Sequence, residues 1–139
     1  MQRQLGPAIL TFLALVSSRA DAASTARMSI GSAGQQGNGD SGYFSVAISS
    51  DGRFVAFQSE ADNLVAGDHN DKDDVFVRDR LSRQTTRVSV SSAGSEANGE
   101  SEFVAISADG RFVAFFSTAS LKSVPNAGSL AISASDCLV

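Results

Sequence analysis

The stretch ISSDGRFVAFQS at residues 48–59 returns as ISADGRFVAFFS at residues 106–117, with ten of the twelve positions identical. The similarity extends towards the N-terminus, because RMSIGSAGQQGNGDS at 27–41 aligns with RVSVSSAGSEANGES at 87–101. The offset is sixty residues in this part and fifty-eight in the DGRFVAF part, so the first copy holds two extra residues near Gly42-Tyr43-Phe44. A self-similar period of this length is typical of stacked or radial repeat architectures.

Each period contains about four strand signals, and a tight turn at Asp51-Gly52 joins the first two. The strands are expected at residues 44–49, 53–59, 74–79, 85–90, 102–107 and 111–117. FVAF is apolar on both faces and predicts a strand that is covered on both sides, whereas TTRVSV alternates as a half-exposed strand does. The pattern predicts an all-β fold of antiparallel four-stranded units, typical of β-propeller blades, with a β-sandwich as the alternative. Helix is disfavoured because Gly, Ser and β-branched residues dominate.

Three phrases resemble the TolB-like, WD-type β-propeller repeats of exported bacterial proteins, over roughly residues 27–119. They are I-S-x-D-G-R-F-V-A-F, S-x-A-x-N-L-V-x-G-D and D-V-F-V-R-D-R. Many such repeats have a proline before Asp-Gly, where this chain has Ser50 and Ala108. The resemblance implies a non-enzymatic binding or scaffold module, periplasmic or extracellular, with a protein or carbohydrate partner. It also implies an alternative, the propeller portion of a prolyl-oligopeptidase-like hydrolase without its catalytic domain.

The first residues have the pattern of a secretory signal peptide. A short polar start is followed by an apolar run from Ala8 to Val16, and then by the small residues Ala20 and Ala22 at the positions that signal peptidase requires. As a helix, this run would span only about 14 Å, too short for a membrane anchor. We therefore expect residues 1–22 to be removed and the remaining chain to lie outside the membrane.

The remaining chain is expected to hold about two blades of an incomplete propeller. The repeat region covers residues 23–119, with repeats near 27–86 and 87–119, and residues 120–139 are a divergent tail, without a third strand, that need not be ordered. Propellers close with about four to eight blades, so the chain is expected to be a fragment. FVAF at 54–57 and at 112–115 would then have a neighbour on one side at most, which predicts self-association through open blade edges.

The composition of the remaining chain argues against some classes of partner and of activity. Removing residues 1–22 takes away Arg3, Arg19 and Asp21, which changes the net charge from −4 to −5 and argues against nucleic acid or anionic lipid as partners. The single histidine, His69, and the single cysteine, Cys137, lack the partners that a zinc site or a catalytic triad needs. No Gly-x-Ser-x-Gly elbow is present. The sequence therefore predicts no enzymatic activity.

The loop at residues 59–74 concentrates acidic side chains, and a calcium site is one interpretation of it. The candidate ligands are Asp68, Asn70, Asp71, Asp73 and Asp74. Their oxygen atoms could supply several of the six to eight ligands that Ca²⁺ takes. However, Lys72 stands where a calcium loop usually has another oxygen ligand, and the glycine turn and distant Glu of an EF-hand are missing. The other interpretation is a solvated acidic turn with local Asx hydrogen bonds. No other cofactor is expected.

In a blade, the loop between the second and third strands emerges at the same end as the link to the next blade. That end would carry Asp40, Glu60, Asp62, Asp68, Asp71, Asp73, Asp74, Glu96 and Glu100. The hairpin turns emerge at the opposite end, which would carry Arg53, Arg80, Arg83 and Arg111. The pattern predicts one acidic, long-looped end that favours partners or cations, and one basic, tight end.

Overall fold

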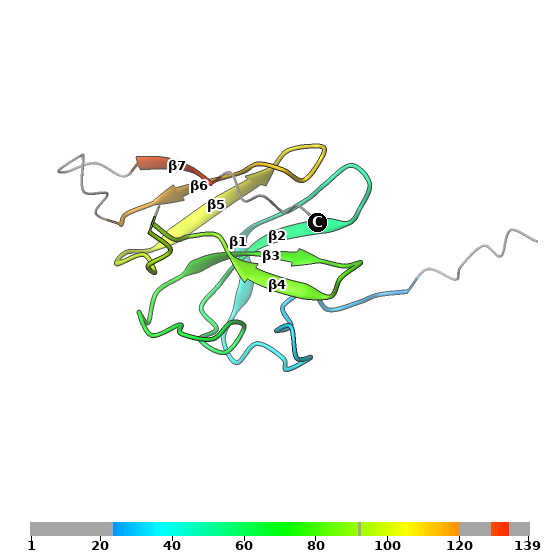
Figure 1. Cartoon of the computed structure of the whole chain (residues 1–139), viewed down its shortest axis with the longest axis horizontal. Coiled ribbons are helices and arrows are strands. Elements are labelled where there is room, and N and C mark those ends of the chain that lie inside the picture. Colours follow the sequence, from blue (N-terminus) through cyan, green and yellow to red (C-terminus); the bar gives the residue numbers. More distant parts are fainter. Residues whose placement is uncertain (1–23, 92, 120–128, 134–139) are drawn as a thin grey trace, which may run out of the picture.

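The computed structural model describes residues 24–91, 93–119 and 129–133 (Figure 1). The expected signal peptide, Cys137 and the rest of the predicted tail lie outside these residues. Within the described parts the fold is all-β, as predicted, with seven strands and no helix. Accordingly, no described segment is a helix long and apolar enough to cross a membrane.

The first sheet is a four-stranded antiparallel unit in the order β1-β2-β3-β4, which confirms the four-stranded prediction. Its strands are β1 (Ser41–Ile48), β2 (Phe54–Ser59), β3 (Asp74–Asp79) and β4 (Gln84–Arg87). The fourth strand ends three residues earlier than predicted. It ends there because Ser89 is buried with its hydroxyl bonded to β3, accepting from the amide of Val75 at 3.0 Å.

The second sheet has three antiparallel strands in the order β5-β6-β7. They are β5 (Ser101–Ile106), β6 (Val113–Ser117) and β7 (Ser129–Ser133). The expectation of no third strand in residues 120–139 is wrong, because β7 pairs with β6 in the position that β3 has beside β2. SLAIS has no similarity to DVFVRD, but a ladder needs only backbone groups, and its alternation of polar and apolar residues is compatible with a strand.

The two hairpins of the repeat have the same turn chemistry. In the first, the Ser49 hydroxyl donates to Asp51 at 2.6 Å, and in the second the Ser107 hydroxyl donates to Asp109 at 2.6 Å. The glycine after each aspartate has a positive φ, 70° and 75° respectively, which only glycine adopts without strain. The duplicated sequence therefore forms duplicated turns.

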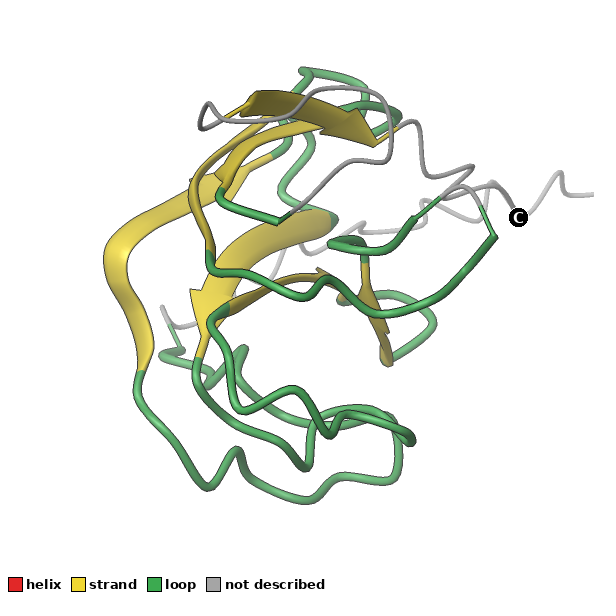
Figure 2. Ribbon diagram, turned by 90° about the vertical axis from the view of Figure 1, so that its left-hand side faces the viewer, coloured by secondary structure: helices red, strands yellow, loops and turns green. Residues whose placement is uncertain are grey.

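The two sheets pack face to face, with β5 against β1, β2 and β3 (Figures 1 and 2). The main core between them consists of Phe54, Ala56, Val75, Val77, Val88, Val104, Val113 and Phe115. At the hairpin end, both the amide and the hydroxyl of Ser50 donate to the carbonyl of Ala108, at 2.9 and 2.8 Å. Ser50 and Ala108 are equivalent residues of the two copies, so the copies meet at matching turns.

A second core covers the opposite face of the first sheet. It consists of Val55, Phe57, Ala61, Leu64 and Phe76, with Met28 and Val65 packed against it. The prediction that FVAF at 54–57 has a neighbour on one side at most is therefore wrong. Segments of the chain itself, near residue 28 and at 61–65, cover the side that the second sheet does not.

Candidate functional site

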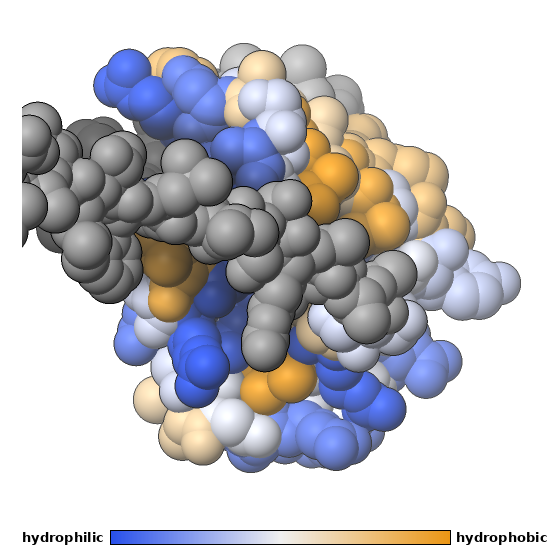
Figure 3. Space-filling model, turned by 90° about the vertical axis from the view of Figure 1, so that its right-hand side faces the viewer, coloured by the Kyte–Doolittle hydropathy of each residue, from blue (hydrophilic) through white to orange (hydrophobic). Residues whose placement is uncertain are grey.

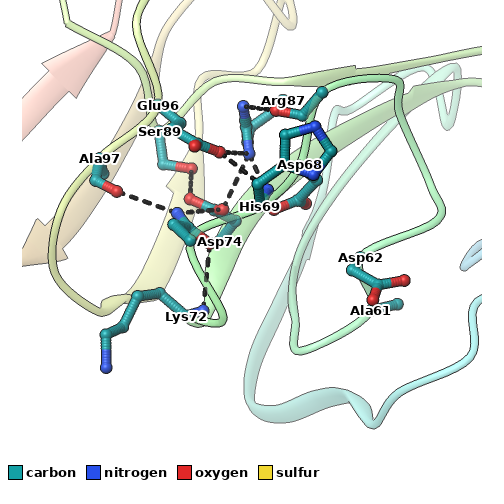
Figure 4. A network of polar contacts seen from close by, with 12 residues as sticks. Ala61, Asp62, Asp68, His69, Lys72, Asp74, Arg87, Ser89, Glu96 and Ala97 are labelled. Carbon is teal, nitrogen blue, oxygen red and sulfur yellow. Dashed lines mark hydrogen bonds and ion pairs between the residues drawn. The ribbon is translucent and has the colours of Figure 1, made fainter.

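The acidic loop of the first copy closes around Arg87, the last residue of β4 (Figure 4). The Arg87 Nη1 atom lies 3.0 Å from Asp68 Oδ1, 3.2 Å from Asp74 Oδ2 and 3.2 Å from Glu96 Oε2. We call these four residues the Arg87 cluster. The Asp74 side chain is fully buried and that of Arg87 is 9% exposed. Because a guanidinium is always charged in proteins, it supplies the positive charge that three carboxylates require.

Asp74 is held by further donors in addition to Arg87. The Ser89 hydroxyl donates to Asp74 Oδ1 at 2.5 Å, and the Asn70 amide donates to Asp74 Oδ2 at 2.9 Å. Both oxygens of this buried carboxylate therefore accept hydrogen bonds, as a buried charge requires. Asp74 starts β3, so these bonds fix the loop at the point where it enters the sheet.

The loop also joins the two copies of the repeat. The amide of His69 donates to Glu96 at 3.1 Å, and the amide of Asp73 donates to Glu100 at 2.7 Å. His69 and Asp73 belong to the first copy, whereas Glu96 and Glu100 belong to the link that leads into β5. The prediction that the loop and this link lie at the same end is confirmed, and the hairpin turns lie at the other end (Figure 1).

The five predicted calcium ligands do not form one ligand set. Asp68 and Asp74 meet at Arg87, and the Asn70 side-chain oxygen accepts from the amide of Lys72 at 3.1 Å. Asp71 is exposed, with a left-handed φ of 50°, and Asp73 accepts from Gln58 at 2.7 Å. Across residues 24–91, 93–119 and 129–133, no three His, Cys, Asp or Glu side chains come together in a group that could hold a metal.

A second acidic group lies beside the Arg87 cluster. Burial raises the pKa of Asp73, the Gln58 hydrogen bond opposes this, and nearby Glu100 and Asp74 add to the rise. The Asp73 Oδ1 atom is buried, and it has no hydrogen-bond partner among the described residues. Burial also raises the pKa of Glu102, with Asp73 and Glu100 as further causes. These carboxyl groups therefore bind a proton more readily than an exposed carboxyl does.

Burial raises the pKa of Asp68 as well, although Arg87 opposes the rise. The ion pair at 3.0 Å does not outweigh the loss of hydration, because Asp74, Glu96 and Asp62 add repulsion. One guanidinium is thus shared among more carboxylates than it can neutralise. The cluster depends strongly on Arg87.

Sequence reasoning missed Arg87, although the repeat contained a signal for it. Arg87 aligns with Arg27, and Glu96 aligns with Gln36. Arg27 Nη1 donates to Gln36 Oε1 at 2.9 Å, the counterpart of the Arg87–Glu96 contact. An arginine that opens both copies, nine residues before a polar side chain, could have been identified as a candidate counter-ion for the acidic loop.

The hairpin end carries a different pair of charges. Arg53 Nη2 lies 2.7 Å from Asp79 Oδ2, and Arg53 Nε donates to Asp79 Oδ1 at 3.1 Å. These bonds hold the pKa of Asp79 well below its usual range, with the Arg53 contact as the largest cause. Arg80 donates to the Gly52 carbonyl at 2.6 Å. Of the four predicted basic side chains, Arg53 and Arg80 therefore bind neighbouring turns to each other.

Exposed aromatic rings gather where β1 and β5 are irregular. The pairing of β1 shifts between Ser41 and Val46, and that of β5 shifts between Glu102 and Ala105. The aromatic patch consists of Tyr43, Phe44 and Phe103, which are 78%, 47% and 58% exposed. The centre of the Phe44 ring lies 4.8 Å from the centre of the Tyr43 ring and 5.6 Å from that of the Phe103 ring.

Phe103 has a φ of 54°, which is unusual for a bulky residue and costs backbone energy. β-bulges redirect side chains and are frequent next to binding sites. The strained backbone and the exposed rings thus coincide at one place on the surface.

Comparison with known proteins identifies no relative of this chain. No protein-family model, no curated protein and no solved structure matches the chain.

Proposed function

We propose that the chain is a non-enzymatic binding or scaffold module of an exported protein, and that its two sheets are blades of a β-propeller. The observation that supports this is the stacking of the two copies through matching turns, with Ser50 bonded to Ala108. Each sheet is built from consecutive strands, as a blade is. A sandwich with Greek-key connections would mix strands from distant parts of the chain.

The role of the acidic loop supports a scaffold. Arg87, Asp68, Asp74 and Glu96 bind one another across the boundary between the copies. The loop therefore stabilises the stacking of the repeats, and this structural use of its charges accounts for its composition.

The aromatic patch is the surface that best supports binding. Aromatic rings supply a large apolar contact area at little entropic cost, and they are frequent in binding surfaces for proteins. Sugar rings can stack on the same flat faces. The partner we propose is accordingly a protein or a carbohydrate that contacts Tyr43, Phe44 and Phe103.

Thermal unfolding of the purified chain against a panel of oligosaccharides and peptides tests this proposal. A ligand present at 100 times its Kd stabilises the folded state by about 2.7 kcal/mol, so at least one member should raise the melting temperature by several degrees. Tyr43→Ala should abolish that rise. Leu81→Ala, which removes an equally exposed side chain in the β3–β4 turn, should keep it. A panel without any rise, or a rise that Tyr43→Ala leaves intact, contradicts binding at this surface.

A further inference from the structure

The contact between the two sheets is directional, because each copy uses a different face of the same repeat. The front face of a copy is defined by Phe54 and Ala56 in the first copy and by Phe112 and Ala114 in the second. The back face is defined by Val46 and Ile48 in the first copy and by Val104 and Ile106 in the second. The front face of the first copy packs on the back face of the second. No second sheet packs on the other two faces within the described residues, and on the back face of the first copy the segments near residue 28 and at 61–65 cover Val55 and Phe57 but leave Val46 and Ile48 exposed.

Equivalent residues are much more exposed on the two open faces than on the two faces that pack together. On the front face, Phe54 is 5% exposed and its equivalent Phe112 is 46% exposed. On the back face, Val104 is 7% exposed and its equivalent Val46 is 64% exposed. Ile48, also on the open back face, is 58% exposed. Figure 3 views the molecule from the side of the hairpin turns and shows apolar residues at this surface beside polar ones.

We propose that the two open faces bind each other between molecules. The front face of the second copy, around Phe112, packs on the back face of the first copy of another molecule, around Val46 and Ile48. The occupant of each open face is thus a second copy of this chain. The proposal rests on continuity with an existing interface, because the same two faces of the same repeat already pack together within the chain.

The turn geometry leaves room for this contact. A Cβ atom at Gly110 would lie 2.3 Å from Phe54 Cδ2, so the Phe54 ring rests directly on this glycine. At the equivalent Gly52, a Cβ atom would meet only Arg80 Nη1 at 3.5 Å and Ile48 Cδ1 at 3.9 Å. Gly52 therefore offers the surface on which Phe112 of another molecule can rest.

The contact between molecules lacks the ion pairs that stabilise the contact within the chain. The Arg87 cluster needs the acidic loop of the preceding copy, and the sequence that follows β6 in the second copy, residues 118–128, includes no Asp or Glu. This stretch of sequence therefore offers no carboxylate to Arg27 of another molecule. The association therefore depends on apolar contact and should be weaker and concentration-dependent. Because front binds back, it is heterologous, and it continues into a closed ring or an open chain.

Light scattering coupled to size-exclusion chromatography, over a concentration series of the purified chain, tests the proposal. The wild type should have a mass above that of the monomer, which is 14.4 kDa for the whole chain, and the mass should rise with concentration. Ile48→Lys on the back face and Phe112→Lys on the front face should each keep the chain monomeric. Ala66→Lys, which changes an exposed residue of the acidic loop at the end opposite to Gly52, should associate as the wild type does.

Mixing the two variants distinguishes this arrangement from a symmetric one. Ile48→Lys keeps its front face and Phe112→Lys keeps its back face, so an equimolar mixture should form a dimer that cannot grow. A monomeric mixture, a wild type that is monomeric at every concentration, or an Ala66→Lys chain that also loses association would overturn the proposal. If a lysine variant loses its far-ultraviolet β signal, threonine at the same position takes its place. No ligand is involved, so these outcomes are independent of binding at the aromatic patch.

Discussion

The same four residues, FVAF, have two different environments in this protein. At 54–57 all four are buried, because the second sheet covers one face and the segments near residue 28 and at 61–65 cover the other. At 112–115 the first residue is 46% exposed and the third is half-buried. Identical side chains on matching strands therefore differ only in their neighbours. Burial in a repeat protein depends on the position of the repeat in the stack.

Matched alanine substitutions should show the largest difference between the copies. Phe54→Ala removes a ring from the core between the sheets and should lower the free energy of unfolding by about 3–5 kcal/mol. Phe112→Ala removes the equivalent, half-exposed ring and should cost about 1 kcal/mol or less. Urea unfolding at a concentration where both variants are monomeric measures the two effects. Equal losses would mean that the second copy is covered as the first is.

The two arginines that open the repeats give the next comparison. Arg87 lies among carboxylates with a 9% exposed side chain, whereas the equivalent Arg27 is exposed and bonded to Gln36. Arg87→Gln leaves Asp74 buried without its counter-ion and should cost about 3 kcal/mol at neutral pH. Arg27→Gln should change stability by about 0.5 kcal/mol or less. The Arg87→Gln loss should shrink as the pH falls, because burial raises the pKa of Asp68 and its protonation removes a charge that the variant leaves without a counter-ion. A loss that does not vary with pH would contradict this explanation.

Much of the fold could be predicted from the sequence because the repeat marks its own strands and turns. The doubled Asp-Gly turn, the apolar FVAF and the alternating TTRVSV placed six strands within about three residues of their observed ends. The strand at 129–133 could not be predicted in this way, since SLAIS pairs through backbone groups alone and does not repeat DVFVRD.

The site was harder to predict, for a physical reason. The acidic loop at 59–74 is visible in the sequence, but its counter-ion Arg87 comes from a different strand, and only tertiary contact brings them together. The aromatic patch also depends on bulges that aim Phe44 and Phe103 at each other. Composition identifies a loop that needs positive charge, and only the fold decides which basic side chain supplies that charge.

The hairpin end offers a smaller contrast, between Arg53 and its equivalent Arg111. Arg53 forms two bonds to Asp79, whereas the Arg111 guanidinium carbon lies 5.8 Å from the centre of the Phe112 ring. Because the pKa of Asp79 is lower in the folded chain than in the unfolded chain, its ion pair contributes stability above the unfolded value of about 3.9. That contribution is lost as the pH falls through the lower folded value.

Asp79→Asn should therefore lower the free energy of unfolding by about 1–2 kcal/mol at pH 7, the range of a hydrogen-bonded charge pair that is partly exposed. The difference from wild type should shrink below about pH 4, as the aspartate protonates in the unfolded chain. Arg111→Gln is the matched control and should cost about 0.5 kcal/mol or less. Unfolding by urea at several pH values measures both variants. A difference that grows on acidification would contradict the role of the Arg53–Asp79 pair.

Calcium is expected to have the smallest effect. The comparison here is between Arg87 and a calcium ion as the positive charge that neutralises the acidic loop. Asp68 and Asp74 are already bound by the guanidinium of Arg87, and a divalent cation placed there would meet a fixed positive charge. Adding millimolar Ca²⁺ should therefore change the melting temperature by about 1 °C or less, since a ligand stabilises only in proportion to its occupancy of the folded state. A rise of several degrees that Asp71→Asn or Asp73→Asn abolishes would instead show that the loop binds calcium beside the Arg87 cluster. Magnesium at the same ionic strength is the control, because it separates site binding from the screening of surface carboxylates.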